Sequence, residues 1–132
     1  MTVEQWVEQV PNNIKDDALW KFQVYPKSLL LADLAWEDCN KLLPDPRGRA
    51  VAEQLIRSAG SICANIEEGY GRGFGRDYAR FLRFSLGSAR ETRRWYYRAR
   101  HLLSDAVLKQ RLHLLDEIIA LLVVHVQKQI GH

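Results

Sequence analysis

Apolar residues recur every three or four positions along four segments of the chain, and this spacing restricts the possible folds more than any other feature. In the last segment the intervals from Leu108 to Val126 are 4, 3, 4, 3 and 4 residues. Such intervals place an apolar stripe along one face of an α-helix, whereas strands need a strict alternation that is scarce here. The sequence therefore predicts an all-α fold, and we expect an antiparallel four-helix bundle.

Proline and capping residues indicate where the four helices begin and end. Pro26 suits the first position of a helix because its missing N–H is not needed there, and Pro44-Asp45-Pro46 stops that helix. Ser104 is a good N-cap for the last helix. The predicted helices cover residues 26–43, 47–69 and 77–103, and the residues that follow Ser104.

Residues 1–25 are expected to form an arm outside the bundle domain of residues 26–132. Thr2 and Gln5 have the spacing of a capping box, which predicts a short helix over residues 2–10. Residues 14–25 are expected to be irregular and to dock their aromatic side chains on the bundle or on a neighbouring subunit. These side chains are Trp20, Phe22 and Tyr25.

Neither a secretory signal nor a membrane span is evident. The amino terminus contains acids and lacks a basic segment followed by an apolar one. The longest apolar run, residues 118–124, is far shorter than the ~20 residues that cross a membrane. Cys39 and Cys63 lie in helical patterns, where a buried thiol is expected rather than a disulfide. We therefore expect a cytoplasmic protein without membrane contact.

Charge is distributed unevenly along the chain, although the formal net charge is only +3. Residues 1–69 carry seven basic and eleven acidic residues. Residues 70–101 carry nine arginines, no lysine and two acids, Asp77 and Glu91. A net charge of +7 within these 32 residues indicates a segment that meets anions or acidic protein.

Most of these arginines fall on one face of the third predicted helix. Between Arg76 and Arg98 the basic positions, together with Gly87, follow intervals of 4, 3, 4, 3, 4 and 4 residues, which share one face at 3.6 residues per turn. The span is roughly 33 Å at 1.5 Å per residue, enough to follow several phosphates. The arginine row consists of Arg76, Arg80, Arg83, Arg90, Arg94 and Arg98, and with Arg72, Arg93 and Arg100 beside it makes up the candidate nucleic-acid-binding set.

Cations at this density repel one another, so a partner must offset the cost. Acids of other helices or subunits, nucleic-acid phosphates and an acidic protein all remain open. We expect some arginines to pair with the acids of the first two helices, which are Asp33, Glu37, Asp38, Glu53, Glu67 and Glu68. Arginine binds phosphates through two parallel hydrogen bonds and stacks on bases. Our hypothesis is therefore nucleic-acid binding, with RNA favoured over DNA. The alternative is an interaction scaffold whose arginines form salt bridges between subunits.

The segment Tyr70-Gly71-Arg72-Gly73-Phe74-Gly75-Arg76 interleaves glycine, arginine and aromatic residues. Such a segment can stack bases and cradle phosphates, or it can simply connect two helices through residues with positive φ. No strand precedes it and no Gly-Lys-Ser/Thr follows it, so Rossmann and P-loop interpretations fail. We prefer the interpretation as a connector.

The sequence shows no constellation of catalytic or metal-ligating residues. The four histidines are scattered, and no histidine or cysteine pair has the spacing of metal ligands. Glu67 and Glu68 are adjacent, so on a helix they diverge by about 100° and make a poor acid–base pair. We therefore expect no enzyme activity, no cofactor and no metal.

Residues 54–72 and 78–91 together resemble the four-helix-bundle family of 23S rRNA intervening-sequence proteins. The shared pattern includes Ala-Asn-Ile, Glu-Gly-Tyr-Gly-Arg, Phe-Leu-Arg and Ser-Leu-Gly-Ser. Glu67 stands where the family often has alanine, and residues 93–100 are richer in arginine than the common pattern. The residues that match the family signature are Asn65, Glu68, Gly69, Gly87 and Glu91, and those that match its basic positions are Arg72, Arg80, Arg83 and Arg90.

This resemblance implies an antiparallel bundle that assembles as a ring-shaped homopentamer. The sequence is also similar to the accessory variability proteins of diversity-generating retroelements. That similarity implies a basic pentamer that binds nucleic acid, RNA or DNA, and that has a reverse transcriptase as its protein partner.

Overall fold

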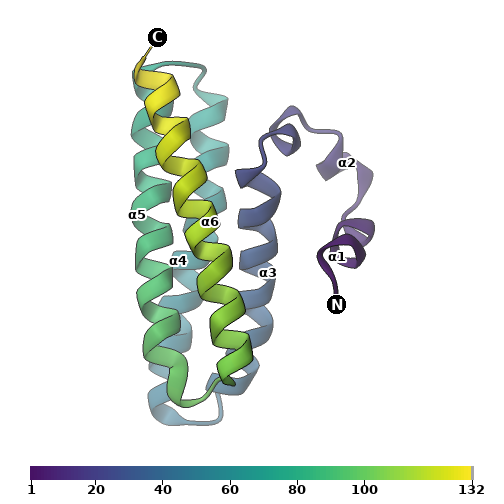
Figure 1. Ribbon diagram of the computed structural model, residues 1–132, viewed down its shortest axis with the longest axis vertical. Helices are drawn as coiled ribbons and strands as arrows, with labels where there is room; N and C mark the ends of the chain where they lie inside the picture. The colour runs from purple at the N-terminus through teal and green to yellow at the C-terminus, as the bar shows by residue number, and fades with distance from the viewer. Residues whose placement is uncertain (132) are drawn as a thin grey trace.

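The computed structural model describes residues 1–131, within which the chain forms six α-helices and two short 3-10 helices. Four long helices lie side by side, and the chain reverses direction between consecutive helices (Figure 1). Each long helix packs against the next, and the first also contacts the last. The long helices are α3 (Val24–Leu42), α4 (Pro46–Gly71), α5 (Arg76–Arg98) and α6 (Asp105–Ile130). The predicted all-α fold is confirmed, with the long helices forming a bundle.

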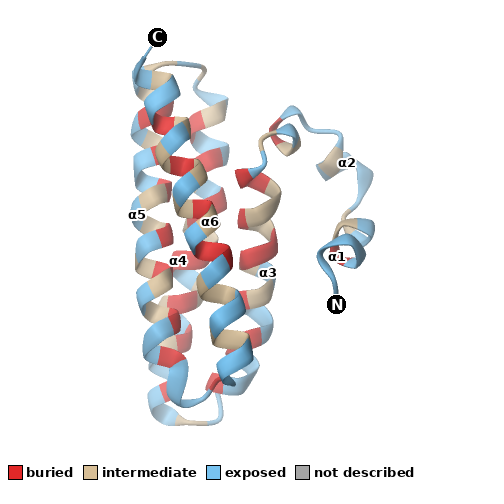
Figure 2. Cartoon of the chain, in the orientation of Figure 1, coloured by how far each residue is buried: buried red, intermediate tan, exposed pale blue. Residues whose placement is uncertain are grey.

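The apolar stripes identified in the sequence form the core of this bundle. Leu31 of α3, Leu55 of α4, Leu82 of α5 and Leu115 of α6 are fully buried. Figure 2 shows buried residues where the long helices face one another and exposed residues on their outer sides. Burial of each such side chain contributes about 1.5–3 kcal/mol, so this shared core fixes the rotation of every helix about its axis.

The helix ends differ from the predicted ones by one to five residues, apart from the start of α6, which follows Ser104 as predicted. Helix α3 begins at Val24 and places Pro26 at its third position, where the N–H also lacks an intrahelical acceptor. Helix α4 continues to Gly71, and α5 ends at Arg98 before the 3-10 turn η2 (Ala99–His101). The Ser104 cap is confirmed, because its side chain accepts a hydrogen bond from the N–H of Val107.

The arm contains α1 (Val3–Gln9), α2 (Asn12–Lys15) and η1 (Ala18–Lys21). The predicted capping box is present, since the Thr2 and Gln5 side chains each bond to the other's backbone N–H. Trp6 donates from Nε1 to Asp33 Oδ2 at 2.8 Å and stacks on Trp20, with 6.2 Å between ring centroids. Phe22 packs against Tyr70 of α4 and His125 of α6, so the arm docks on its own bundle, one of the two expected outcomes. The irregular course expected for residues 14–25 is wrong, because this stretch holds the end of α2, all of η1 and the start of α3.

Within residues 1–131, no helix combines the length and the apolar content needed to cross a membrane.

Candidate nucleic-acid interface

Helix α5 turns its arginine row away from the core. Its buried side chains, which include Tyr78, Leu82, Ser85 and Tyr96, contact the other helices. On the opposite side all six members of the row are exposed, as the periodicity of the sequence predicts. The row is therefore an outer surface of the bundle rather than part of its packing.

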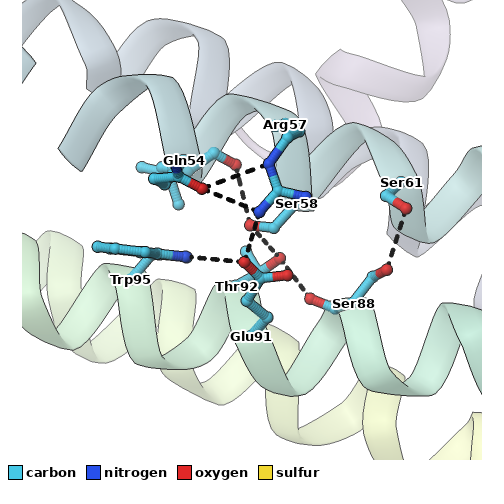
Figure 3. Close-up of polar contacts among 9 residues, drawn as sticks. Gln54, Arg57, Ser58, Ser61, Ser88, Glu91, Thr92 and Trp95 are labelled. Atoms are coloured by element: carbon cyan, nitrogen blue, oxygen red, sulfur yellow. Dashed lines mark hydrogen bonds and ion pairs between the residues drawn. The ribbon is translucent and has the colours of Figure 1, made fainter. Parts of the chain in front are cut away.

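Small polar residues hold α5 against α4 in this rotation (Figure 3). Ser85 Oγ donates to the carbonyl oxygen of Ile62 at 2.8 Å. Thr92 Oγ1 and Ser58 Oγ lie 2.9 Å apart, and Ser88 Oγ and Ser61 Oγ lie 3.0 Å apart. Small side chains allow the two backbones to approach, and the buried hydroxyls are satisfied across the seam.

Glu91, one of the two acids of α5, is directed toward α4 rather than toward the arginine row. Its Oε2 accepts from Arg57 of α4 at 2.6 Å and from Trp95 Nε1 at 3.1 Å, contacts that Figure 3 shows together. Arg94 lies one helical turn from Glu91 but makes no ion pair with it. The seam thus removes a carboxylate that would otherwise neutralise the row.

Some candidate arginines do have acidic partners. The ion pairs are Arg72–Glu68 at 3.0 Å, Arg72–Asp77 at 3.8 Å, Arg80–Asp77 at 2.9 Å and Arg93–Asp116 at 2.9 Å. All of these arginines are substantially solvent-exposed, so each pair contributes little, about 0–1 kcal/mol, and leaves the guanidinium able to exchange partners.

The remaining candidates lack an acidic partner within residues 1–131. Arg98 lies over the Trp95 ring at 4.6 Å, and Arg100 lies over the Tyr97 ring at 4.2 Å. The other four candidates form neither an ion pair nor a cation–π contact within residues 1–131. These are Arg76, Arg83, Arg90 and Arg94. These four side chains lie along α5 from its first residue to its last turn.

Fewer candidate arginines pair with the acids of α3 and α4 than the sequence led us to expect. Among those acids, only Glu68 pairs with a candidate arginine, and its partner Arg72 is one turn away on the same chain segment. Asp33 accepts from Trp6, and Glu67 accepts from the Tyr25 hydroxyl at 2.6 Å. The reason is geometric, because the outer face of α5 points away from α3 and from the outer side of α4.

Asp38 has a partner that the sequence analysis missed. Arg111 of α6 bonds to both Asp38 oxygens, at 2.8 and 3.1 Å, and Tyr96 donates to the same carboxylate at 2.7 Å. Burial and the Asp38 carboxylate raise the pKa of Tyr96 far above its usual value, so its hydroxyl keeps its proton and donates. A single arginine within the apolar stripe of α6 was the available signal.

Two of the family-signature residues, Gly69 and Glu91, serve the α4–α5 seam. Asn65 donates to the Ser61 carbonyl within α4 at 2.8 Å. By contrast, a Cβ at Gly69 would lie 2.7 Å from Cβ of Phe81 in α5. Gly87 differs from these residues because it is exposed in the middle of the arginine row, with no atom within 4 Å of the position a Cβ would take.

The glycine-rich segment connects α4 to α5, which confirms its interpretation as a connector between two helices. Gly73 and Gly75 have φ values of 101° and 78°, which glycine adopts without strain. The Gly75 N–H donates to Gln129 Oε1 at 3.2 Å, which ties the connection to α6. Phe74 projects into solvent with 87% of its surface exposed. No group of three metal-ligating side chains forms among the described residues.

Comparison with known proteins identifies similar sequences and folds. A family described as 23S rRNA-intervening sequence protein matches residues 20–124. A crystal structure of a protein of unknown function, from the S23 ribosomal protein family of Bacteroides thetaiotaomicron, has a TM-score of 0.71 and 25% sequence identity. The alignment covers 78% of this chain and 97% of that one. No curated protein matches the sequence.

Proposed function

Because the chain belongs to the 23S rRNA-intervening sequence protein family, we propose that it is a non-enzymatic bundle protein that binds nucleic acid, RNA in preference to DNA, through the outer face of α5. One observation carries this proposal. Arg83, Arg90 and Arg94 are exposed and have no acidic partner among the described residues, on a helix whose own Glu91 is held by Arg57. The family description supports RNA as the ligand.

Phosphates would relieve the repulsion within the row. Along the helix axis Arg83 and Arg90 lie about 10 Å apart, and Arg94 lies about 6 Å further, at 1.5 Å per residue. Guanidinium groups at these intervals can contact successive phosphates of one strand and displace condensed counterions. Contacts of this kind recognise the backbone, so binding is expected to depend strongly on salt and weakly on sequence.

The direct test is a binding titration of labelled RNA and DNA oligonucleotides at low salt. We expect R83Q/R90Q to lose at least tenfold in affinity, because two cations leave the row. The matched control is K41Q/R49Q, which removes two exposed cations that form no ion pair in residues 1–131 and lie on α3 and α4. Absence of any association, or an equal loss in the control, would contradict the proposal.

A scaffold function is the second candidate, and a distinct observation favours it. Glu37 of α3 and Glu53 of α4 are exposed, and neither forms an ion pair within residues 1–131. In a homopentamer, which we also propose, such acids of one subunit can meet the arginine row of the next. Light scattering separates the two functions, because R83Q/R90Q would dissociate a ring joined by these salt bridges and would leave a nucleic-acid-binding ring intact.

A further inference from the structure

The arginine face of α5 carries exposed aromatic rings that phosphate binding alone does not require. Phe84 is 49% exposed and Tyr97 is 55% exposed, on the same helix as the arginine row. The Phe84 ring stands edge-on against Phe81, with 5.5 Å between centroids. Phe81 in turn lies beneath the guanidinium groups of Arg72 and Arg80, at 4.9 and 5.0 Å. Phe84 is thus a braced ring with open surface beside several cations.

Gly87 is a second unexplained feature of the same surface. Glycine in the interior of a helix is destabilising relative to alanine. At Gly87 the space that a Cβ would occupy is empty, so packing within the chain does not explain why a glycine stands there. Gly69 of α4 shows the opposite case, since neighbouring side chains fill the space there. Gly87 lies one turn from Phe84 and from Arg83, and one turn before Arg90. It leaves bare backbone where a ligand can approach closely.

We propose that the ligand is an unpaired RNA strand that crosses α5 at Gly87. Arg83 and Arg90 hold its phosphates on either side, and one base stacks on Phe84. This inference rests on the proposed function and adds the strandedness of the ligand. In a duplex the bases are paired and stacked on one another, so a protein ring reaches a base face only where the strand is single.

The experiment compares a labelled 20-nucleotide oligo(U) with an RNA duplex of equal length at the same salt concentration. The wild-type chain should bind the single strand at least tenfold more tightly than the duplex. Phe84→Ala should weaken binding of oligo(U) about tenfold, because stacking on one base is lost. It should leave the salt dependence unchanged, since no phosphate contact is removed. Trp36→Ala, which removes an exposed ring of α3, is the control and should bind like the wild type.

Gly87→Gln tests the crossing point without risk to the fold. Glutamine favours a helix more than glycine, and both Gly87 and Gly60 of α4 have empty space around a Cβ. Thermal stability should therefore rise in Gly87→Gln and in the matched control Gly60→Gln, while only Gly87→Gln weakens RNA binding.

The outcomes distinguish this inference from the function on which it rests. Salt-dependent binding with equal affinity for strand and duplex, unaffected by Phe84→Ala and Gly87→Gln, would overturn the unpaired-strand inference alone. A failure of the wild-type chain to bind either RNA at low salt would overturn the proposed function and this inference together.

Discussion

A Cβ at Gly69 would lie 2.7 Å from Phe81 Cβ and 2.9 Å from Tyr78 Cδ1, so α4 and α5 meet there without room for a side chain. We expect Gly69→Ala to force the helices apart and to lower the free energy of unfolding by about 1–3 kcal/mol. Gly60→Ala is the control, because open space surrounds that position and alanine should stabilise the helix by up to ~1 kcal/mol. Urea unfolding measures both, and an equally stable Gly69→Ala variant would contradict the close approach.

The buried contact between Asp38 and Arg111 is a second determinant at the scale of single residues. Their side chains are only 8% and 12% exposed, so removal of one partner strands a charge in the bundle. We expect Arg111→Met to lower the free energy of unfolding by about 3–5 kcal/mol. Arg47→Met removes an exposed partner of Asp45 and should have little effect. Similar denaturation midpoints for the two variants would show that Asp38 has other means of compensation.

At the scale of elements, His125 of α6 joins the arm to the bundle. Phe22 packs edge-on against its ring at 5.1 Å, and its Nε2 lies 3.2 Å from the Tyr78 hydroxyl. Burial, with a smaller contribution from Lys128, lowers the pKa of His125 below its usual value of 6.5. The unfolded chain therefore binds a proton at a higher pH than the folded chain does.

This difference has a definite sign. Stability is highest above the unfolded pKa and falls as the pH drops from about 7 toward the lowered folded pKa, because protons then favour the unfolded chain. We expect a lower free energy of unfolding at pH 5.5 than at pH 7.5, and a smaller difference in His125→Gln. Chemical denaturation at the two pH values checks this, and an unchanged pH dependence in the variant would rule out His125 as its source.

Elements were easier to predict from the sequence than the contacts between them. Helix α6 follows from its apolar intervals and from the Ser104 cap, which are local signals. The end of α5 at Arg98 was missed because Ala99, Leu102 and Leu103 continue the apolar pattern of a helix beyond it. The outward rotation of the arginine row followed from periodicity alone. The sequence did not show which arginines lack acidic partners. Arg57 pairs with Glu91, 34 positions away, and Arg111 pairs with Asp38, 73 positions away, so these pairs depend on the tertiary fold.

For the whole molecule, cations are concentrated on α5, whereas α3 and α4 carry exposed charges of both signs. Arginines occupy the outer face of α5, while exposed acids such as Glu37 and Glu53 lie on α3 and α4. The concentration of arginines on α5 directs anions toward that helix. A ring in which Glu37 or Glu53 of one subunit meets the arginine row of the next would use the same surface as the ligand, so the oligomer and the ligand compete unless they use different arginines.

The central claim is that the guanidinium groups of α5 remain available to an outside anion, and the salt dependence of RNA binding tests it most directly. For the wild-type chain, log K for a single strand should fall linearly with log salt concentration, by about 0.7 per phosphate contacted. In R83Q/R90Q/R94Q the slope should be smaller by about 2, because three contacts are lost. A slope equal to that of the wild type would show that these arginines do not contact RNA and would contradict the account.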